Sequence, residues 1–184
     1  MRESTVLENE QETTKKLLKI GWLAGLIDGE GTVALIPVKS KARNGNTTYT
    51  YHPKVNIYNN DESLIAEIAK ILDTFGIRYF IQQRVGRDPR NNDAELDTIN
   101  YNISVSDMKS VKVLLELVKD LLFTHKRART FLTLRFLNLR INRIDYFNHS
   151  DEEIDIINKY LELVGSSTTV RRTQNNTIIC EETV

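Results

Sequence analysis

The sequence predicts an α+β domain in which helices cover one face of an antiparallel sheet. The expected elements run in the order helix, two strands, helix, two strands and then helices, and strands that follow one another in this way usually pair antiparallel. Two of the strands also alternate between apolar and polar residues, which is typical of a sheet with one buried face. Tyr49, Tyr51, Val55 and Ile57 alternate with Thr50, His52, Lys54 and Asn56, and Ile99, Tyr101, Ile103 and Val105 alternate with Thr98, Asn100, Asn102 and Ser104.

The N-terminal part of the chain is expected to hold one helix and one hairpin. Residues 1–12 are polar and predict a disordered or frayed extension. A helix at about Thr13–Gly29 and strands at about Thr32–Lys39 and Thr48–Tyr58 follow. The pair Asn44-Gly45 between the two strands is a strong hairpin signal.

The rest of the domain repeats this pattern and then becomes helical. Apolar residues at helical spacing predict a helix from Asp61 to Phe75, with Gly76 just past its end. Ser150 and Glu153 have the spacing of a capping box, which marks the start of the last helix. The other strands are expected at about Arg78–Val85 and Leu96–Val105, and the other helices at about Asp107–Leu122, Lys126–Ile141 and Asp151–Leu163.

Length and composition indicate one globular domain. The chain has 184 residues, of which 40% are hydrophobic and 27% charged, values typical of a soluble protein with a single core. We expect that domain over residues 13–165, followed by a polar C-terminal tail over residues 166–184. Within this tail, Ile178-Ile179 is a candidate short strand.

The charge is zero overall but unevenly distributed. A neutral chain argues against a nucleic-acid partner when taken alone. Two stretches contain basic residues and no acids, however, which predicts one basic face on a neutral body. Their basic residues are Lys39, Lys41, Arg43 and Lys54 in the first, and Lys126, Arg127, Arg129, Arg135, Arg140 and Arg143 in the second.

Several protein classes are excluded by the same sequence. No apolar run reaches the roughly 18 residues of a membrane span, and the N-terminus lacks the apolar core of a secretory signal. The single cysteine, Cys180, excludes an internal disulfide framework and a cysteine-rich zinc site. We therefore expect an intracellular protein without a membrane partner, in an archaeal or bacterial cytoplasm, a mitochondrion or a chloroplast.

The segment from Trp22 to Gly31, WLAGLIDGEG, breaks two local rules. Gly25 and Gly29 leave one helix face bare, although each glycine costs a helix up to about 1 kcal/mol relative to alanine. Glu30 then follows at the helix C-terminus, where the helix dipole disfavours a carboxylate. Such exceptions point to function, and the bare face would let another backbone approach closely. The alternative is an ordinary helix stop with Glu30 merely exposed.

Residues Leu23–Gly31 resemble the signature helix of the LAGLIDADG homing endonucleases. They differ from it only by Gly29 for alanine and Glu30 for aspartate. The order of elements over roughly residues 17–141 also matches the αββαββα unit of that family. The resemblance implies a saddle-shaped antiparallel sheet with helices on one face, here with additional C-terminal helices.

The resemblance also implies a homodimer. Family members pack two signature helices side by side, but this sequence contains one copy. The second copy would come from an identical chain about a two-fold axis. The implied seam consists of Trp22, Gly25, Leu26 and Gly29.

The implied activity is a metal-dependent, staggered double-strand break in a long pseudo-palindromic DNA target, which promotes intron mobility. Glu30 and Gly29 would bind Mg²⁺, for which Mn²⁺ would substitute, and the cations would neutralise two nearby Glu30 carboxylates. Lys126 matches a family lysine near the scissile phosphate, and Arg129 or His125 could share its role. Asn59, or alternatively Asn60, would position the attacking water, although either could instead cap the helix that begins at Asp61. Asp28 is expected to be structural and to help end the helix, with a contribution as a metal ligand as the alternative.

The polar sheet face and the hairpin loops are the expected DNA contacts, because amide and basic side chains read base edges. A merely solvated face is the alternative, and the facing of Gln82 and Gln83 stays open. The candidates are Lys39, Lys41, Arg43, His52, Lys54, Asn56, Gln82, Arg84, Arg87, Thr98, Asn100 and Asn102.

Three other functions compete with the nuclease. The first is an RNA maturase on the same fold, for which intron RNA would be the partner. The second is a DNA-binding regulator that has lost cleavage. The third is a purely structural protein, which leaves the glycine pair unexplained.

Overall fold

The computed structural model describes residues 2–41, 47–87, 97–143, 148–173 and 178–182, and it confirms the predicted α+β class. Four strands form one antiparallel sheet in the order β1-β2-β4-β3, and two further strands form a separate hairpin. The helices are α1 (Arg2–Glu30), α2 (Glu62–Thr74), α3 (Met108–Val118), α4 (Lys126–Arg140) and α5 (Asp151–Leu163). The strands are β1 (Gly31–Lys41), β2 (Thr47–Asn59), β3 (Phe80–Arg87), β4 (Asp97–Val105), β5 (Thr168–Arg172) and β6 (Ile178–Glu182).

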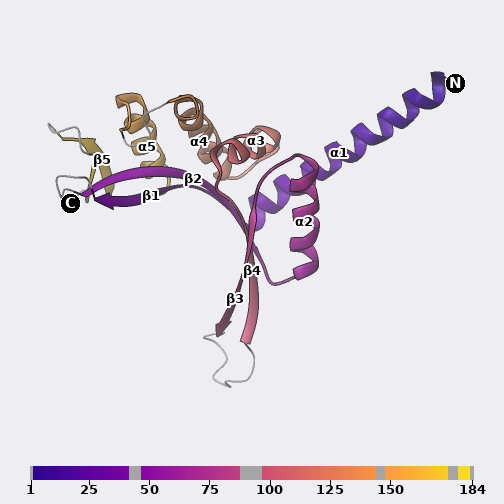
Figure 1. Cartoon of the computed structure of the whole chain (residues 1–184), viewed down its shortest axis with the longest axis horizontal. Helices are drawn as coiled ribbons and strands as arrows, with labels where there is room; N and C mark the ends of the chain where they lie inside the picture. Colours follow the sequence, from indigo (N-terminus) through magenta and orange to yellow (C-terminus); the bar gives the residue numbers. More distant parts are fainter. Residues whose placement is uncertain (1, 42–46, 88–96, 144–147, 174–177, 183–184) are drawn as a thin grey trace.

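The sheet is sharply bent between its two hairpins. Strand β1 pairs with β2 over its whole length, whereas β2 pairs with β4 only over Val55–Asn59. Figure 1 shows that β1–β2 extends under α3, α4 and α5, while β3–β4 turns away beside α2. The helices therefore lie on one side of the sheet, and the helix-free face is concave, as in a saddle.

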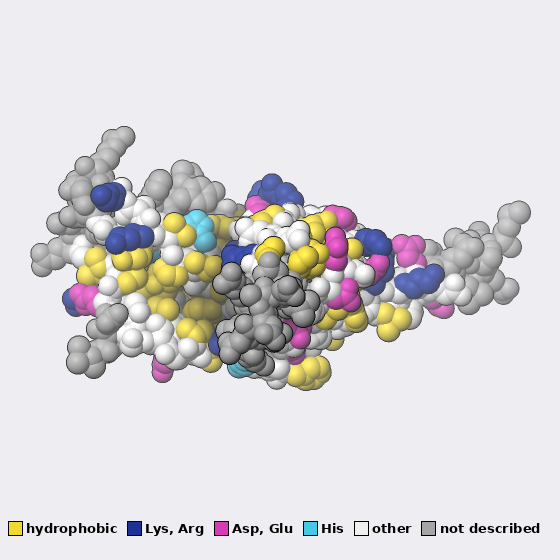
Figure 2. All heavy atoms as spheres, turned by 90° about the horizontal axis from the view of Figure 1, so that it is seen from below, with side chains coloured by type: hydrophobic (Ala, Val, Ile, Leu, Met, Phe, Trp, Pro, Cys, Tyr) yellow, Lys and Arg dark blue, Asp and Glu magenta, His cyan; other side chains and the backbone are white. Residues whose placement is uncertain are grey.

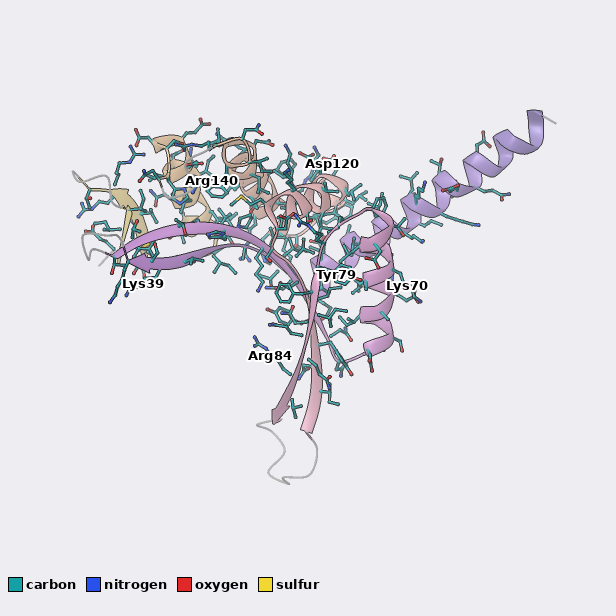
Figure 3. The ribbon with its side chains drawn as sticks, viewed as in Figure 1. Lys39, Lys70, Tyr79, Arg84, Asp120 and Arg140 are labelled. Carbon is teal, nitrogen blue, oxygen red and sulfur yellow. The ribbon has the colours of Figure 1, made fainter. Side chains whose placement is uncertain are left out.

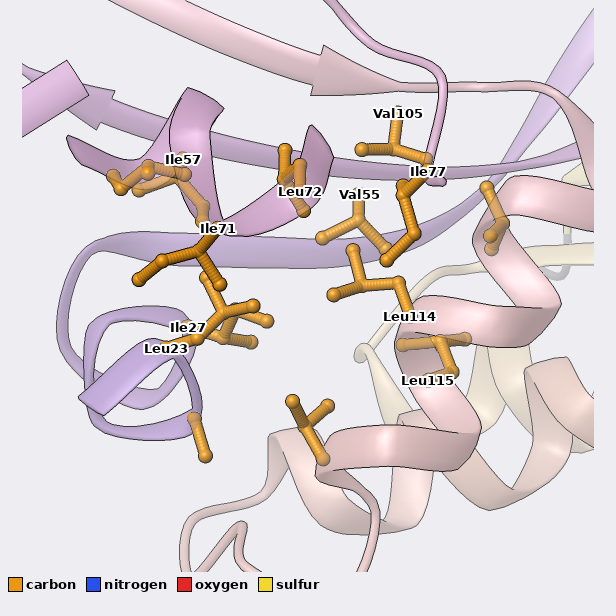
Figure 4. Packing of buried hydrophobic residues seen from close by; sticks show 14 of the residues in the cluster. Leu23, Ile27, Val55, Ile57, Ile71, Leu72, Ile77, Val105, Leu114 and Leu115 are labelled. Atoms are coloured by element: carbon orange, nitrogen blue, oxygen red, sulfur yellow. The ribbon is translucent and has the colours of Figure 1, made fainter. Parts of the chain in front are cut away.

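The main core lies where the bend brings α1, α2 and α3 against the sheet. Leu23 and Ile27 of α1 meet Val55 and Ile57 of β2, and all four are at most 2% exposed (Figure 4). This confirms the predicted buried face of β2. Burying an aliphatic side chain of this size contributes roughly 1.5–3 kcal/mol, so this packing fixes the position of α1 on the sheet.

A second core joins α4 and α5 to the outer half of β1–β2. Tyr51, Phe136 and Ile157 are buried in it together with Ile178 of β6. The tail is thus not a free polar segment: β5 and β6 form an antiparallel hairpin that packs on the body. The candidate strand at Ile178-Ile179 is confirmed, because β6 begins at Ile178.

A buried polar cluster fastens α5 to α4. The predicted capping box of Ser150 and Glu153 is confirmed, and Glu153 is fully buried. Its Oε2 atom lies 2.7 Å from Nη1 of Arg143, 3.5 Å from Nη1 of Arg140 and 3.4 Å from Nδ1 of His149. Burial pushes the pKa of Glu153 upward, but hydrogen bonds from His149 and the Ser150 N–H, with the charge of Arg140, hold that pKa below its ordinary value.

Helix α1 is longer than expected. It begins at Arg2, so residues 2–12 continue the helix instead of forming a frayed extension. Polarity alone is a poor guide here, because Glu, Gln and Lys are good helix formers and no glycine or proline precedes Gly21. The ion pair of Glu12 with Lys16, four residues apart and 2.9 Å long, adds to this.

The second basic stretch, from Lys126 to Arg143, covers α4 and the turn after it. Its basic residues do not form one face, so that part of the charge prediction is wrong. Lys126 points toward α1, while Arg140 and Arg143 point toward Glu153 on α5. Successive helix residues are turned by about 100°. A basic run along a helix is therefore spread around its axis, whereas a run along a strand reaches only two faces.

Candidate functional site

Glu30 stands at the point where α1 passes directly into β1. Helix α1 ends at Glu30, and β1 begins at Gly31. A Cβ atom on Gly31 would lie 2.7 Å from Cα of Ile27, so only glycine permits this direct passage. Glu30 itself is exposed and has no hydrogen-bond or ion-pair partner among the described residues. The backbone of Glu30 is thus fixed while its carboxylate stays available.

Asp28 holds the connection between α3 and α4 against this helix end. Its carboxylate accepts hydrogen bonds from the Phe123 N–H at 2.7 Å and from the Thr124 hydroxyl at 2.6 Å. Burial raises the pKa of Asp28, but these hydrogen bonds and the charge of Lys126 outweigh it and leave the pKa below its ordinary value. The expected structural role of Asp28 is confirmed.

Lys126 binds the C-terminal carbonyls of α1. Its Nζ donates to the carbonyl oxygens of Ile27 at 2.9 Å and Asp28 at 2.7 Å, and the residue is 9% exposed. These carbonyls lack partners within the helix, and the negative helix end favours a cation. Burial lowers the pKa of Lys126, and the nearby charges of Asp28 and Glu30 oppose this effect. One of its three N–H groups remains for another acceptor.

The two asparagines after β2 have different surroundings. The side-chain oxygen of Asn59 accepts a hydrogen bond from the Asp61 N–H at 2.9 Å, whereas Asn60 is exposed. Asp61 is itself the cap of α2, accepting from the N–H groups of Ser63 and Leu64. Capping by Asn60 is therefore wrong, and Asn59 supports the turn before the helix.

His125 and Arg129, the other two basic candidates near Lys126, are not held in place by Glu30 or Asp28. His125 precedes α4 without a side-chain capping bond. Arg129 is partly buried, and its Nε atom has no partner among the described residues.

The strand register settles which residues share the concave face. Asn102 pairs with Tyr58 on one side and with Gln82 on the other. Gln82 and Arg84 therefore lie on the face of His52 and Lys54, and Gln83 lies on the opposite face. Figure 3 shows Arg84 on the concave side of the sheet.

The amide residues on this face are unequally accessible. Asn100 is exposed, but Asn56 and Asn102 are 6% and 4% exposed because they lie at the bend. The oxygen of Asn56 accepts a hydrogen bond from the Ser104 hydroxyl at 2.7 Å, and that of Asn102 has no partner among the described residues. Asn56 and Asn102 therefore lie on the concave face, but they are too buried at the bend to contact a ligand there.

The basic candidates lie farther from the bend. Lys54 stands over the ring of Phe80, with Nζ 5.5 Å from the ring centre. Burial, together with the charges of Arg140 and His149, lowers the pKa of His52, which favours a neutral ring at neutral pH.

Two candidates lie on the other face of β1. By alternation Lys39 and Lys41 fall on the side of Leu35, and both are exposed near the far end of the strand. Figure 3 labels Lys39 at this end. Arg43 and the side chains of Arg87 and Thr98 lie outside the described residues.

One face of α1 is uncovered in the single chain. Gly25 and Gly29 have open space where a Cβ would lie, and Trp22 and Leu18 beside them are 41% and 69% exposed. Leu26 is half-buried at the edge of this strip. Phe123, whose N–H bonds to Asp28, is an 87% exposed aromatic residue beside the site. The sequence analysis did not single it out, and the signal available was its position next to Thr124-His125-Lys126.

A single chain offers few metal ligands. The described part of the chain contains no group of three His, Cys, Asp or Glu residues able to hold an ion together. Glu30 and the Gly29 carbonyl supply the oxygen atoms that Mg²⁺ prefers, but an octahedral site needs further ligands from outside the chain. None of the described helices is long and apolar enough to cross a membrane.

Comparisons with known proteins give a consistent result. A family model described as a LAGLIDADG-like domain matches residues 18–132. The structure is similar to the homing endonuclease I-CvuI in complex with its target in the presence of calcium, with a TM-score of 0.55 and 19% identity over 83% of this chain and 81% of that chain. An archaeal intron-encoded homing endonuclease, I-Vdi141I complexed with DNA, has a TM-score of 0.52 and 18% identity over 80% of each chain.

A third structure differs in length. A single-substitution mutant of I-SmaMI has a TM-score of 0.52 and 17% identity over 78% of this chain, but only 42% of that chain is covered. At these identities the likeness shows the fold. The search of curated proteins gave no match.

Proposed function

This chain belongs to the LAGLIDADG homing endonuclease family, and from this premise we propose that it is a site-specific endonuclease that cuts double-stranded DNA as a homodimer. The observation that carries the proposal is the exposed, unpartnered Glu30 at the end of a helix with one bare face. The reaction is a staggered double-strand break in a long pseudo-palindromic target, which would promote intron mobility.

The uncovered strip of α1 supports two copies per active unit. It consists of Leu18, Trp22, Gly25 and Gly29, and the open space at the two glycines admits a second helix backbone. The chain also spans 81% of I-CvuI but only 42% of I-SmaMI, as expected if a chain of the I-SmaMI length contains two such units. A two-fold axis along this strip would bring the two Glu30 residues together and give each strand one cutting site.

A divalent cation, Mg²⁺ with Mn²⁺ as a substitute, is the proposed cofactor. The donor set fits, because Glu30 and the Gly29 carbonyl are hard oxygen ligands and a second chain and DNA phosphates would complete the shell. Such an ion supplies positive charge to the scissile phosphate and lowers the pKa of a bound water. The structure of I-CvuI with its target was obtained in the presence of calcium, which is consistent with a divalent-ion site in this fold.

The chain's own residues would position the reacting groups. Lys126 fixes the carbonyls that precede Gly29, and its remaining N–H is the proposed donor to the phosphate being cut. Asn59 is the proposed water-positioning residue, although its oxygen is already bonded to the Asp61 N–H, which leaves its amide N–H groups for this role.

The concave sheet face is the proposed DNA-binding surface. Its exposed side chains include Arg84, Gln82 and Asn100 on β3–β4 and His52 on β2, and Lys54 beside them is partly exposed. Residues 31–59 contain no Asp or Glu, which suits a polyanion. Contacts to phosphates would make affinity salt-dependent, and the amides and Arg84 would read base edges.

Replacement of Glu30 by glutamine tests the proposal, since it removes the charge at nearly constant shape. We expect Glu30→Gln to bind a selected target duplex with unchanged affinity and to cut it at background level in Mg²⁺. Glu162→Gln is the matched control, because Glu162 is another exposed glutamate near a helix C-terminus, far from this site. Normal cleavage by Glu30→Gln would refute the assignment.

A further inference from the structure

The helix-free face of β1 carries an apolar strip, whereas β2 and β4 present polar side chains on the same face. Ala34, Ile36 and Val38 alternate with Val33 and Leu35, which are buried on the helix side. Val38 is 44% exposed, and Ala34 and Ile36 are partly exposed. Figure 2 shows hydrophobic side chains over the part of this face that β1 and β2 form, with most of the visible acids at the other end of the molecule.

This strip cannot read bases by hydrogen bonding. Ala34, Ile36 and Val38 have no side-chain donor or acceptor. Their cross-strand neighbours on β2 are Lys54, His52 and Thr50, in that order. The strip is therefore an apolar track flanked by polar and cationic side chains, which differs from β3–β4, where Gln82 and Arg84 can make bidentate contacts.

We infer that β1 recognises thymine methyl groups in the outer part of each DNA half-site, through Ala34, Ile36 and Val38. The inference rests on the proposed function and adds the sequence preference of the site. Thymine is the one base that presents a methyl group in the major groove, and apolar side chains are its usual partners. DNA is the favoured occupant because the strip continues directly from Glu30, and neither β1 nor β2 contains an Asp or Glu residue.

The continuity of α1 and β1 also gives the distance of these contacts from the cut. A strand rises about 3.3 Å per residue, so Ala34, Ile36 and Val38 lie roughly 13, 20 and 26 Å along the chain from Glu30. At about 3.4 Å per base pair, these distances correspond to roughly four, six and eight base pairs. We therefore expect thymine to be enriched about four to eight base pairs from the cutting site in each half.

The test uses uracil, which pairs as thymine does but lacks the methyl group. A randomised duplex library is selected for binding to the wild-type protein, and each thymine of the best duplex is then replaced by deoxyuridine. At the positions named above we expect about fourfold weaker binding per replacement, the factor for one buried methyl group. Val38→Ala should lose the uracil effect at the outermost position.

Val85→Ala is the matched control for that variant. Val85 is an exposed valine of the same sheet, but the register places it on the face opposite to Gln82 and Arg84. The uracil effect should persist in it.

The possible failures are distinguishable. Selective binding with no uracil effect at these positions refutes methyl recognition and leaves the nuclease proposal standing. Failure to bind any duplex refutes both. A changed oligomeric state of Val38→Ala with unaltered DNA binding would assign the strip to contacts between protein copies and refute the inference.

Discussion

The open space at Gly25 and Gly29 of α1 is called the glycine notch here. Filling it should stabilise the single chain and weaken the proposed dimer. A Cβ at Gly25 meets nothing within 4 Å in the single chain, so Gly25→Ala gains up to about 1 kcal/mol of helix stability there. For a chain of this size that corresponds to a rise in Tm of roughly 2–4 °C. In the proposed dimer, the same methyl group would enter the seam, and Gly25→Leu would hold the helix backbones apart.

Two measurements separate these effects. Thermal unfolding at concentrations where the protein is monomeric reports the gain in the single chain, and sedimentation equilibrium with and without duplex DNA reports the dimer. Ala66→Leu controls for added bulk, since Ala66 is exposed on α2 away from the strip. An unchanged dimer dissociation constant for Gly25→Leu would refute the reasoning, because the notch would then face solvent and not a second helix.

Three further substitutions test the supports of the site. Glu153→Gln should cost about 3–5 kcal/mol by leaving the buried charge of Arg140 without this carboxylate. Because the pKa of Glu153 is depressed below 4.5 in the folded state, its stabilisation is present above pH 4.5 and lost as the pH falls through the folded value. Urea unfolding across this range should show a smaller pH slope for the variant, and an identical slope would contradict the charge assignment. Lys126→Met should lose about 1.5–3 kcal/mol and abolish cutting, whereas retained cutting would exclude Lys126 from the reaction. Gly31→Ala should cost about 1–3 kcal/mol through its clash with Ile27, and unaltered urea unfolding would show that the passage from helix to strand can relax.

The sheet and the helix order could be predicted because they depend on local patterns. The alternation around Val55 and the helical spacing around Ile68 are set by which side of each element is buried, and that is written in neighbouring residues. The direct passage of Glu30 into β1 was not predicted, because the helix was expected to end at about Gly29 and the strand to begin at about Thr32. Gly31, the residue type that such a close approach requires, was the available signal.

The supports of the site could not be predicted in the same way. Lys126 bonds to carbonyls of residues 27 and 28, nearly one hundred positions earlier, so no local pattern announces the contact. A strand at Ile178-Ile179 was predicted, but its partner β5 was missed. Strand β5 has five residues and is held by a distant partner, Asn158, which bonds both backbone groups of Val170. The buried state of Asn56 likewise arises from the bend of the sheet, which only the assembled fold defines.

Helix α1 passes into β1 without a connecting loop, and this has a consequence for the length of DNA target that the protein would accept. A base pair inserted at the centre of a palindrome would move the two halves apart by about 3.4 Å and rotate them by roughly 35° about the duplex axis. In the proposed dimer, β1 would follow directly from the helix at the two-fold axis, with no connecting loop to accommodate that rotation. The protein should therefore cut targets with substitutions at many positions, but not targets with a single base pair inserted or deleted between the two half-sites.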